Sequence, residues 1–324
     1  MISASIILPF RRRVLPVLTL SVALAGCGSS PTAPPPGPRP LALACPASLE
    51  VPSASGAPVP VSFPSPTASG GAGGVTVTCT PATGATFASG STAVNCTATD
   101  GNGARATCSF AVAVKPIPEL TRTRFLAFGD SLTEGKLSVT LSMLVDSPAH
   151  SYPAKLLKLL EDRYTSQDPV VLNDGFGGEL TNNGASRLTD AIDDHRPEAV
   201  LLMHGVNDLN STATGVVQST ADGIEELTKR ALQAGLPTFV ATLPPLGPGG
   251  KAGCPECVEP LNERVRAMVA AKGAILVDVH AAWGNRTGLM GADGIHPTEQ
   301  GYQVIAEAFF EAIRRNLEKA PITP

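Results

Sequence analysis

Short apolar runs alternate with helical patterns over the last two-thirds of this 324-residue chain, and this alternation constrains its fold more than any other feature. The apolar runs cover residues 124–128, 170–172, 199–203, 238–243 and 275–279. Helical patterns follow near 152–164, 185–194, 216–234, 259–271 and 297–317. Strands and helices that alternate in this way predict a parallel sheet with helices on both faces. Functional side chains of such a sheet lie beyond the carboxyl ends of its strands.

Two motifs near those ends carry the residues of a serine nucleophile system. Gly129-Asp130-Ser131-Leu132 follows the first apolar run, and Asp293-Gly294-Ile295-His296-Pro297 precedes the last helix. A serine hydroxyl needs an imidazole to take its proton and a carboxylate to orient that imidazole. Each motif alone is more often an ordinary turn or helix cap.

Two more polar blocks follow the second and third apolar runs. The first extends from Asn173 to Gly184 and contains Gly178, and the second is Gly205-Val206-Asn207-Asp208. A tetrahedral intermediate needs hydrogen-bond donors for its oxyanion, and a backbone amide at Gly178 and the side chain of Asn207 are suitable donors. Glycine permits close approach of a substrate to its amide, because it has no Cβ.

In order and spacing, the four blocks resemble those of the SGNH (GDSL-type) hydrolases over residues 122–318. The resemblance implies an α/β protein with a flavodoxin-like three-layer α/β/α sandwich, a five-stranded parallel sheet, and ester hydrolysis through an acyl-enzyme. By position, Ser131 is the nucleophile, His296 the base and Asp293 its orienting carboxylate. Gly178 and Asn207 are the oxyanion donors beside the Ser131 amide. The choice of Gly178 over Gly177 or Gly175 depends on the spacing from Asn173 and Gly184.

Other polar residues near the blocks are assigned supporting roles. We expect Asp130 and Asp208 to hold loops, and Pro297 to occupy the first position of the last helix. His204, where the family usually has an apolar residue, is interpreted as structural in preference to substrate-contacting. The remaining histidines lie at predicted element ends, where capping is the default role: His150, His195 and His280.

Residues 41–115 have a different composition, rich in Val, Thr, Ala and Ser, and they predict a small β-sandwich. The turn sequence Asp100-Gly101-Asn102-Gly103 predicts a hairpin of residues 94–99 and 106–114. Together with Cys45-Pro46, this segment resembles a hyalin-repeat (HYR) domain. The resemblance implies a small all-β immunoglobulin-like domain, and we expect it to contact a surface or a glycan.

The first 40 residues predict export and a lipid anchor. Arg11, Arg12 and Arg13 precede an apolar stretch over 14–25 that is too short to span a bilayer comfortably. Leu24-Ala25-Gly26-Cys27 resembles a bacterial lipobox, which implies a signal peptide over 1–26 and acylation of Cys27. Gly28 then points to the outer membrane in a two-membrane bacterium, and the Pro-rich residues 27–40 form a tether. The alternative is an ordinary secretory signal with a chance cysteine.

The other six cysteines are an even number, as expected in an oxidising compartment. Cys254 and Cys257 are expected to form a local disulfide, with a redox or metal role as the alternative. The pairing of the remaining four is left open: Cys45, Cys79, Cys96 and Cys108.

Composition excludes nucleic acid as a partner. The formal charge is −4, and without the three signal-peptide arginines 21 basic residues face 28 acidic ones, which gives −7. We therefore expect an exported ester hydrolase without a metal or organic cofactor, acting on small-molecule or glycan esters, preferentially short-acyl or carbohydrate esters. The alternatives are a lipase or lysophospholipase-type esterase, and an adhesive or scaffold lipoprotein with a vestigial hydrolase domain.

Overall fold

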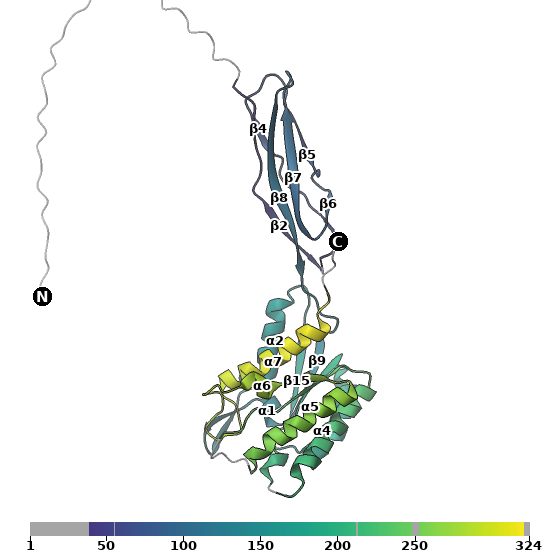
Figure 1. Ribbon diagram of the computed structural model, residues 1–324, viewed down its shortest axis with the longest axis vertical. Coiled ribbons are helices and arrows are strands. Elements are labelled where there is room, and N and C mark those ends of the chain that lie inside the picture. The colour runs from purple at the N-terminus through teal and green to yellow at the C-terminus, as the bar shows by residue number, and fades with distance from the viewer. Residues whose placement is uncertain (1–38, 55, 212, 248–252, 321–324) are drawn as a thin grey trace, which may run out of the picture.

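The computed structural model describes residues 39–54, 56–211, 213–247 and 253–320. An elongated β unit and a larger α/β unit follow one another along the chain (Figure 1). The expected signal peptide, the lipidation site Cys27 and all but the last two residues of the tether lie outside the described residues.

The α/β unit is built on a five-stranded sheet in which every pair of neighbours is parallel. Its order is β12-β9-β13-β14-β15. The second strand along the chain, β12, therefore lies at the edge of the sheet, beside the first strand, β9. This is the flavodoxin-like order, and it confirms the predicted fold class. The strands are β9 (Arg124–Gly129), β12 (Val170–Gly175), β13 (Ala199–Met203), β14 (Thr238–Ala241) and β15 (Ile275–Val277).

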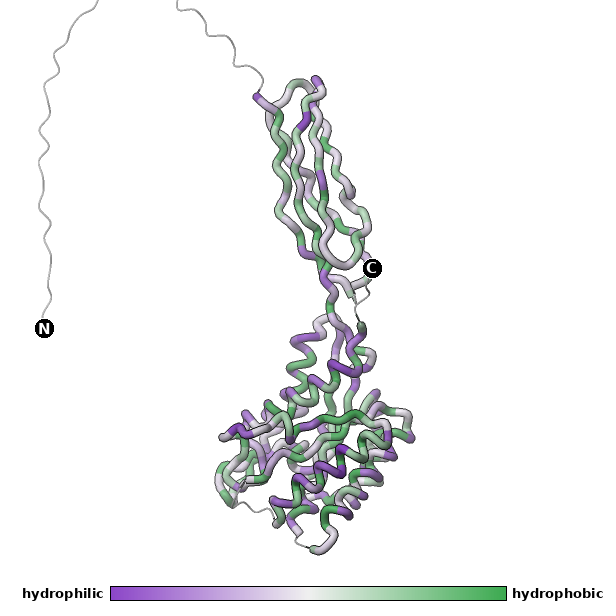
Figure 2. Tube along the Cα trace, in the orientation of Figure 1, coloured by the Kyte–Doolittle hydropathy of each residue, from purple (hydrophilic) through white to green (hydrophobic). Residues whose placement is uncertain are grey.

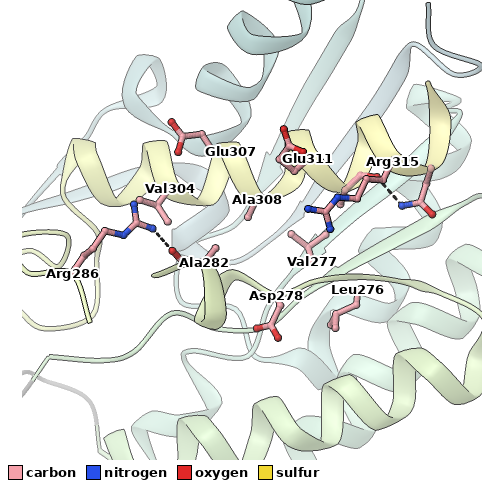
Figure 3. A pocket seen from close by; sticks show the side chains of 12 residues that line it. Leu276, Val277, Asp278, Ala282, Arg286, Val304, Glu307, Ala308, Glu311 and Arg315 are labelled. Atoms are coloured by element: carbon pink, nitrogen blue, oxygen red, sulfur yellow. Dashed lines mark hydrogen bonds between the residues drawn. The ribbon is translucent and has the colours of Figure 1, made fainter. Parts of the chain in front are cut away.

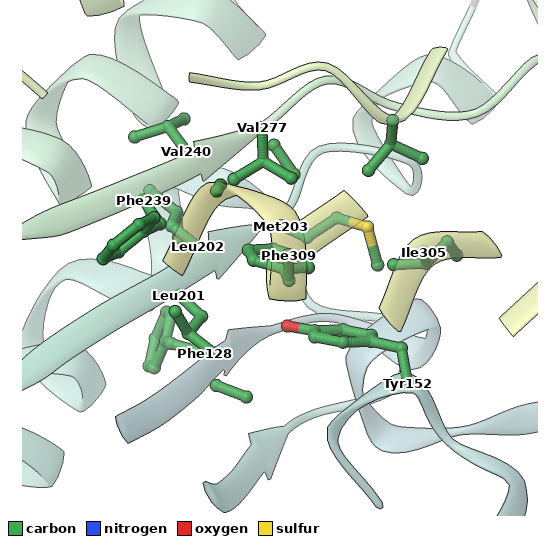
Figure 4. Packing of buried hydrophobic residues seen from close by; sticks show 14 of the residues in the cluster. Phe128, Tyr152, Leu201, Leu202, Met203, Phe239, Val240, Val277, Ile305 and Phe309 are labelled. Atoms are coloured by element: carbon green, nitrogen blue, oxygen red, sulfur yellow. The ribbon is translucent and has the colours of Figure 1, made fainter. Parts of the chain in front are cut away.

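Helices cover both faces of this sheet (Figure 1). One layer contains α2 (Tyr152–Arg163), α6 (Val279–Trp283) and α7 (Glu299–Leu317), and the other contains α3 (Gly184–His195), α4 (Val216–Gln233) and α5 (Val258–Lys272). The three inner strands, β9, β13 and β14, are mostly apolar because both of their faces are buried, and they lie in the apolar centre of the unit in Figure 2. Figure 4 shows the packing, in which the rings of Tyr152 and Phe309 stack with centroids 4.9 Å apart.

Several predicted element ends differ from the structure by two or three residues, and side-chain caps explain two of these differences. Helix α7 begins at Glu299, because the Thr298 side chain accepts a hydrogen bond from the Gly301 amide and caps it, so Pro297 lies outside the helix. Strand β15 ends at Val277 and not at residue 279, because Asp278 accepts from Ala281 and caps α6.

The sequence analysis did not predict the elements between Ser131 and α2. The short helix α1 (Ser131–Glu134) is followed by an antiparallel hairpin of β10 (Lys136–Thr140) and β11 (Met143–Asp146). Four 3-10 turns complete the unit: η1 (Pro148–His150), η2 (Thr181–Asn183), η3 (Asp208–Asn210) and η4 (Pro255–Cys257).

The N-terminal unit is all-β, as predicted, with its own buried apolar cluster. Its main sheet has the order β2 (Leu49–Ala54), β8 (Arg105–Ile117), β7 (Gly90–Thr99) and β5 (Thr76–Thr80). The predicted hairpin is the β7–β8 pair, with Asp100 accepting from the amides of Asn102 and Ala104 at its turn. Two smaller antiparallel pairs complete it: β1 (Ala42–Ala44) with β4 (Thr67–Ser69), and β3 (Val59–Pro60) with β6 (Thr86–Phe87).

The described residues form three disulfides. Cys254 pairs with Cys257, as predicted. In the β unit, Cys45 pairs with Cys108 and Cys79 with Cys96, which resolves the connectivity that the sequence left open. A β unit of this size buries little apolar surface, so two cross-links are a substantial supplement to its core.

The chain enters the α/β unit along the end of α7. Leu120 is buried, and its backbone amide and carbonyl both bond the side chain of Gln167. Glu318, just after α7, accepts hydrogen bonds from Arg163 and Tyr164. Within the described part of the chain, no helix is both long enough and apolar enough to cross a membrane.

Candidate active site

Ser131 lies just beyond the carboxyl end of β9, in a turn that requires glycine at position 129. A Cβ at Gly129 would lie 2.0 Å from the carbonyl oxygen of Met203, so any side chain there would push β13 away. Asp130 then caps α1 by accepting from the Leu132 amide at 3.0 Å. This cap places Ser131 at the sheet edge, where it is 4% exposed.

The structure brings Asp293 and His296 to Ser131 from the far end of the sequence. The Nε2 atom of His296 lies 2.8 Å from Ser131 Oγ, and its Nδ1 atom lies 2.6 Å from Asp293 Oδ2. The second carboxylate oxygen, Oδ1, accepts from the amides of Ile295 and His296, each at 3.0 Å. Both carboxylate oxygens are therefore occupied, and the ring has a fixed orientation.

The electrostatics of Asp293 favour its ionised form. Desolvation by burial raises the pKa of this carboxyl, but hydrogen bonds from His296 and from the Ile295 amide outweigh it and lower the pKa below its ordinary value. An ionised Asp293 stabilises positive charge on the imidazole of His296. The Asp293 amide itself donates to Ser138 Oγ at 2.9 Å, which links the loop to the β10–β11 hairpin.

Gly178 lies in the turn after β12 with its φ at +84°, a conformation that favours glycine. No atom lies within 4 Å of the position that its Cβ would take, so the space in front of it is open. The neighbouring glycines are less free, because the Gly175 amide donates to Asn173 Oδ1 and Gly177 faces Glu134 and Lys136. Among the three candidates, Gly178 is the glycine that has open space around it.

Asn207 follows β13, the other neighbour of β9. Its Nδ2 atom donates to the backbone carbonyl oxygen of Glu179 at 3.0 Å, so it lies next to the Gly178 turn. The preceding amides, of Gly205 and Val206, donate to Asp130 Oδ2 at 3.1 and 3.3 Å. As predicted, Asp130 holds a loop, and Asp208 does the same by accepting from Thr181.

A cluster of charged side chains beside these turns was not predicted. His204 is buried, and its Nε2 atom lies 3.0 Å from Glu179 Oε2. Glu179 also accepts from Arg187, whose guanidinium lies 3.8 Å from the ring centroid of Phe128. In the sequence, Glu179 could be noted only as an acidic residue next to Gly178, and no sequence pattern indicated a role for Arg187.

The rim of the site combines apolar and polar surface. Among the described residues, exposed large apolar side chains gather on the β10–β11 hairpin and the Gly178 turn: Val139, Leu141, Met143, Leu144, Val145, Phe176 and Leu180. Asn207 also lines a pocket of about 320 Å³, together with hydroxyl and amide side chains that include Asn182, Ser211 and Thr214 and with the apolar Leu180 and Val216.

A larger groove of about 410 Å³ lies elsewhere, between α7, α6 and the edge strand β15 (Figure 3). Its floor is apolar and its rim carries both signs of charge, including Arg286, Glu307 and Arg315. None of the five predicted site residues lines it, so the sheet edge at Ser131 is the candidate active site. The described residues contain no His, Cys, Asp and Glu group suited to hold a metal ion.

Comparisons with known proteins agree with this fold. The model of the GDSL-like Lipase/Acylhydrolase family matches residues 127–304, and that of the HYR domain matches residues 39–114. Over 85 residues, 26% of this chain and 38% of the relative, the chain is 34% identical to an arylesterase of Vibrio mimicus. Over 182 residues, 53% of this chain and 23% of the relative, it is 24% identical to a multidomain esterase of Ruminococcus flavefaciens. The chain thus spans well under half the length of both relatives.

Among solved structures, the inhibitor-bound aryl esterase of M. smegmatis aligns with a TM-score of 0.53 and 23% identity. The alignment covers 60% of this chain and 99% of that chain. At this identity the likeness shows a shared fold.

Proposed function

The chain belongs to the GDSL-like lipase/acylhydrolase family, and from this premise we propose that it is a carboxylic ester hydrolase that works through an acyl-enzyme on Ser131. The observation that carries the proposal is the continuous hydrogen-bonded series from Ser131 Oγ through His296 to Asp293. Its spacing suits proton transfer from Ser131 Oγ to His296 Nε2, while Asp293 orients the imidazole at Nδ1.

In the first half-reaction, Ser131 Oγ attacks the ester carbonyl carbon while its proton passes to His296 Nε2. Asp293 stabilises the imidazolium that forms. The tetrahedral intermediate collapses with cleavage of the carbon–oxygen bond, and His296 returns the proton to the departing alcohol. A water molecule then attacks the acyl-enzyme with His296 again as base, which releases the acid and restores Ser131.

The oxyanion would be stabilised by the amides of Ser131 and Gly178 and by the side chain of Asn207. An asparagine amide has two hydrogens. One is held by the Glu179 carbonyl, which leaves the second for the oxyanion. A donor of this kind contributes about 10²- to 10³-fold to kcat.

For the substrate, we propose short-acyl or carbohydrate esters. The pocket beside Asn207 supports this choice, because its hydroxyl and amide side chains suit a polyhydroxylated alcohol. A series of p-nitrophenyl esters of increasing acyl length, followed by acetylated oligosaccharides, tests it. Hydrolysis that is fastest for acetyl esters agrees with the proposal, and a preference for long acyl chains contradicts it.

The apolar rim favours a second candidate, a lipase or lysophospholipase-type esterase. Exposed Val139 and Met143 on the hairpin could contact a long acyl chain, since the hairpin is bonded to Asp293 through Ser138. Under this candidate, Val139→Ser with Met143→Ser lowers hydrolysis of a dodecanoyl ester but not of an acetyl ester. Ser142→Ala, in the exposed connection between the two strands, is the matched control, and equal effects on both esters contradict the lipase candidate.

We also propose an exported, lipid-anchored protein. The proposed units are a signal peptide over 1–26, acylated Cys27 with a tether over 27–40, an HYR-like domain over 41–115 and the hydrolase domain over 122–318. The HYR-like domain would contact a surface or a glycan. Metabolic labelling with radioactive palmitate tests the anchor: label that is lost in Cys27→Ala supports it, and label that persists contradicts it.

A scaffold protein with an inactive hydrolase domain is the alternative from another class. It predicts that a fluorophosphonate probe does not label the folded protein.

A further inference from the structure

A buried set of charged side chains connects the turn that carries Ser131 to the turn that carries Gly178. At its centre, His204 is 1% exposed and lies between two carboxylates. Its Nε2 atom is 3.0 Å from Glu179 Oε2, and its Nδ1 atom is 3.6 Å from Asp130 Oδ2. Within the described structure, this Nδ1 atom has no hydrogen-bond partner. His204 therefore lies between two buried carboxyl groups, those of Glu179 and Asp130.

Glu179 is held from its other side by Arg187. The guanidinium donates from Nε to Glu179 Oε1 at 2.9 Å and from Nη2 to Oε2. It also donates to the carbonyl oxygens of Asp174 and Gly129, near the carboxyl ends of β12 and β9. Desolvation raises the pKa of Glu179, but the hydrogen bonds from His204 and Arg187 outweigh it and lower this pKa to about 2. Glu179 is thus a carboxylate with a fixed orientation.

The main chain of Glu179 holds the oxyanion donors. Its carbonyl oxygen accepts from Asn207 Nδ2 at 3.0 Å, and its amide donates to the Phe176 carbonyl across the Gly178 turn. Asp130, at the other end of the set, precedes Ser131 and accepts from the Gly205 and Val206 amides. The side chains that hold Glu179 and Asp130 in place therefore also fix the direction of the Asn207 amide.

We propose that His204 is a positioning residue for the oxyanion hole, which acts on Asn207 through Glu179. The inference rests on the proposed function and adds to it a residue that touches neither substrate nor triad. Stability alone is a weak reason for such a set, because replacing buried ionic groups with apolar residues of similar volume is often neutral or stabilising. Geometry at the oxyanion is the better reason, because small misplacements of catalytic groups are costly, at about 10²-fold per 1 Å.

The test is a double-mutant cycle with p-nitrophenyl acetate on the purified full chain. We expect His204→Leu to lower kcat by about 10-fold or more with KM nearly unchanged, because it disturbs transition-state contacts only. Asn207→Ala lowers kcat by about 10²-fold or more. Adding His204→Leu to Asn207→Ala then causes less than about a 2-fold further loss, because the two act as one unit. His195→Leu, at the exposed end of α3, is the control histidine.

Two results overturn the proposal: a folded His204→Leu protein with wild-type kcat, or an equal fold loss from His204→Leu in the presence and absence of Asn207. The second result would show a general structural role. If His204→Leu does not fold, Glu179→Gln takes its place in the same cycle. This substitution keeps the side-chain volume and removes the carboxylate charge that His204 and Arg187 bind. Ser131→Ala tests the proposed function separately from the role of His204. Activity that persists in Ser131→Ala refutes the proposed mechanism, whatever the effect of His204→Leu.

Discussion

The side-chain amide of Asn207 is bonded at 3.0 Å to the backbone carbonyl oxygen of Glu179, which locks the turn after β13 to the turn after β12. These strands lie on either side of β9, whose end carries Ser131. The sheet order therefore brings three turns distant in sequence to one edge.

Replacing Asn207 with alanine is expected to lower kcat for an aryl ester by about 10²- to 10³-fold with a small change in KM, because one oxyanion donor is lost. Steady-state kinetics of purified protein measure this. Exposed Asn210, three residues further on, is the matched control, and Asn210→Ala should behave like the wild type. A large rise in KM with unchanged kcat would instead assign Asn207 to ground-state binding.

The position of the backbone oxyanion donor can be tested with a pair of glycine substitutions. Gly178→Ala forces a side chain into φ +84°, at a cost of about 1–3 kcal/mol, and we expect a clear loss of kcat. A Cβ at Gly177 would approach only the flexible end of Glu134 and the Lys136 side chain, so Gly177→Ala should lose less. A larger loss of kcat in Gly177→Ala than in Gly178→Ala would instead assign the oxyanion donor to the Gly177 amide.

The disulfide between Cys45 and Cys108 is expected to stabilise the β unit without affecting hydrolysis. It joins cysteines 63 positions apart, and the β unit has a core separate from that of the α/β unit. The double substitution to alanine should lower the unfolding free energy of the β unit by about 4 kcal/mol, with unchanged kcat. Differential scanning calorimetry and ester kinetics on the same sample measure both. A parallel loss of activity would show that the two units are energetically coupled.

Glu318 should make the stability of the α/β unit depend on pH. Hydrogen bonds from Arg163, and then from Tyr164, hold the pKa of this carboxyl below its ordinary 4.5. The contribution of Glu318 to the unfolding free energy is therefore fully present above pH 4.5, and it is lost as the pH falls through the lower pKa of the folded state. Glu318→Gln should cost about 1–3 kcal/mol at pH near 7 and much less in strong acid, measured by urea unfolding. A Glu318→Gln deficit that is equal at both pH values, with exposed Glu161→Gln as the control, would contradict this assignment.

The sheet could be predicted from the sequence because its strands are buried on both faces and read as continuous apolar runs, as in Ala199–Met203. The β10–β11 hairpin could not, because Val139 and Met143 are apolar yet exposed, so their pattern does not reveal a buried face. The helix start predicted at Pro297 and the strand end predicted at Val279 were misplaced, because side-chain caps from Thr298 and Asp278 decide them.

Ser131, Gly178 and Asn207 could be proposed from motif spacing because each follows a strand, and Asp293 and His296 because their motif precedes the last helix. The His204–Glu179–Arg187 set could not, since its members are dispersed in sequence and only the folded chain shows that they touch. His204 gave a partial signal as a polar residue at the end of an apolar run, and the structure shows that it is buried.

The central claim is that Ser131 is the nucleophile, and labelling by a fluorophosphonate probe tests it most directly. Intact-mass analysis of the wild-type chain should show one added probe, and Ser131→Ala should show none while its aryl esterase activity falls by about 10³-fold or more. The same mass shift in folded Ser131→Ala, with hydrolysis retained, would contradict the account.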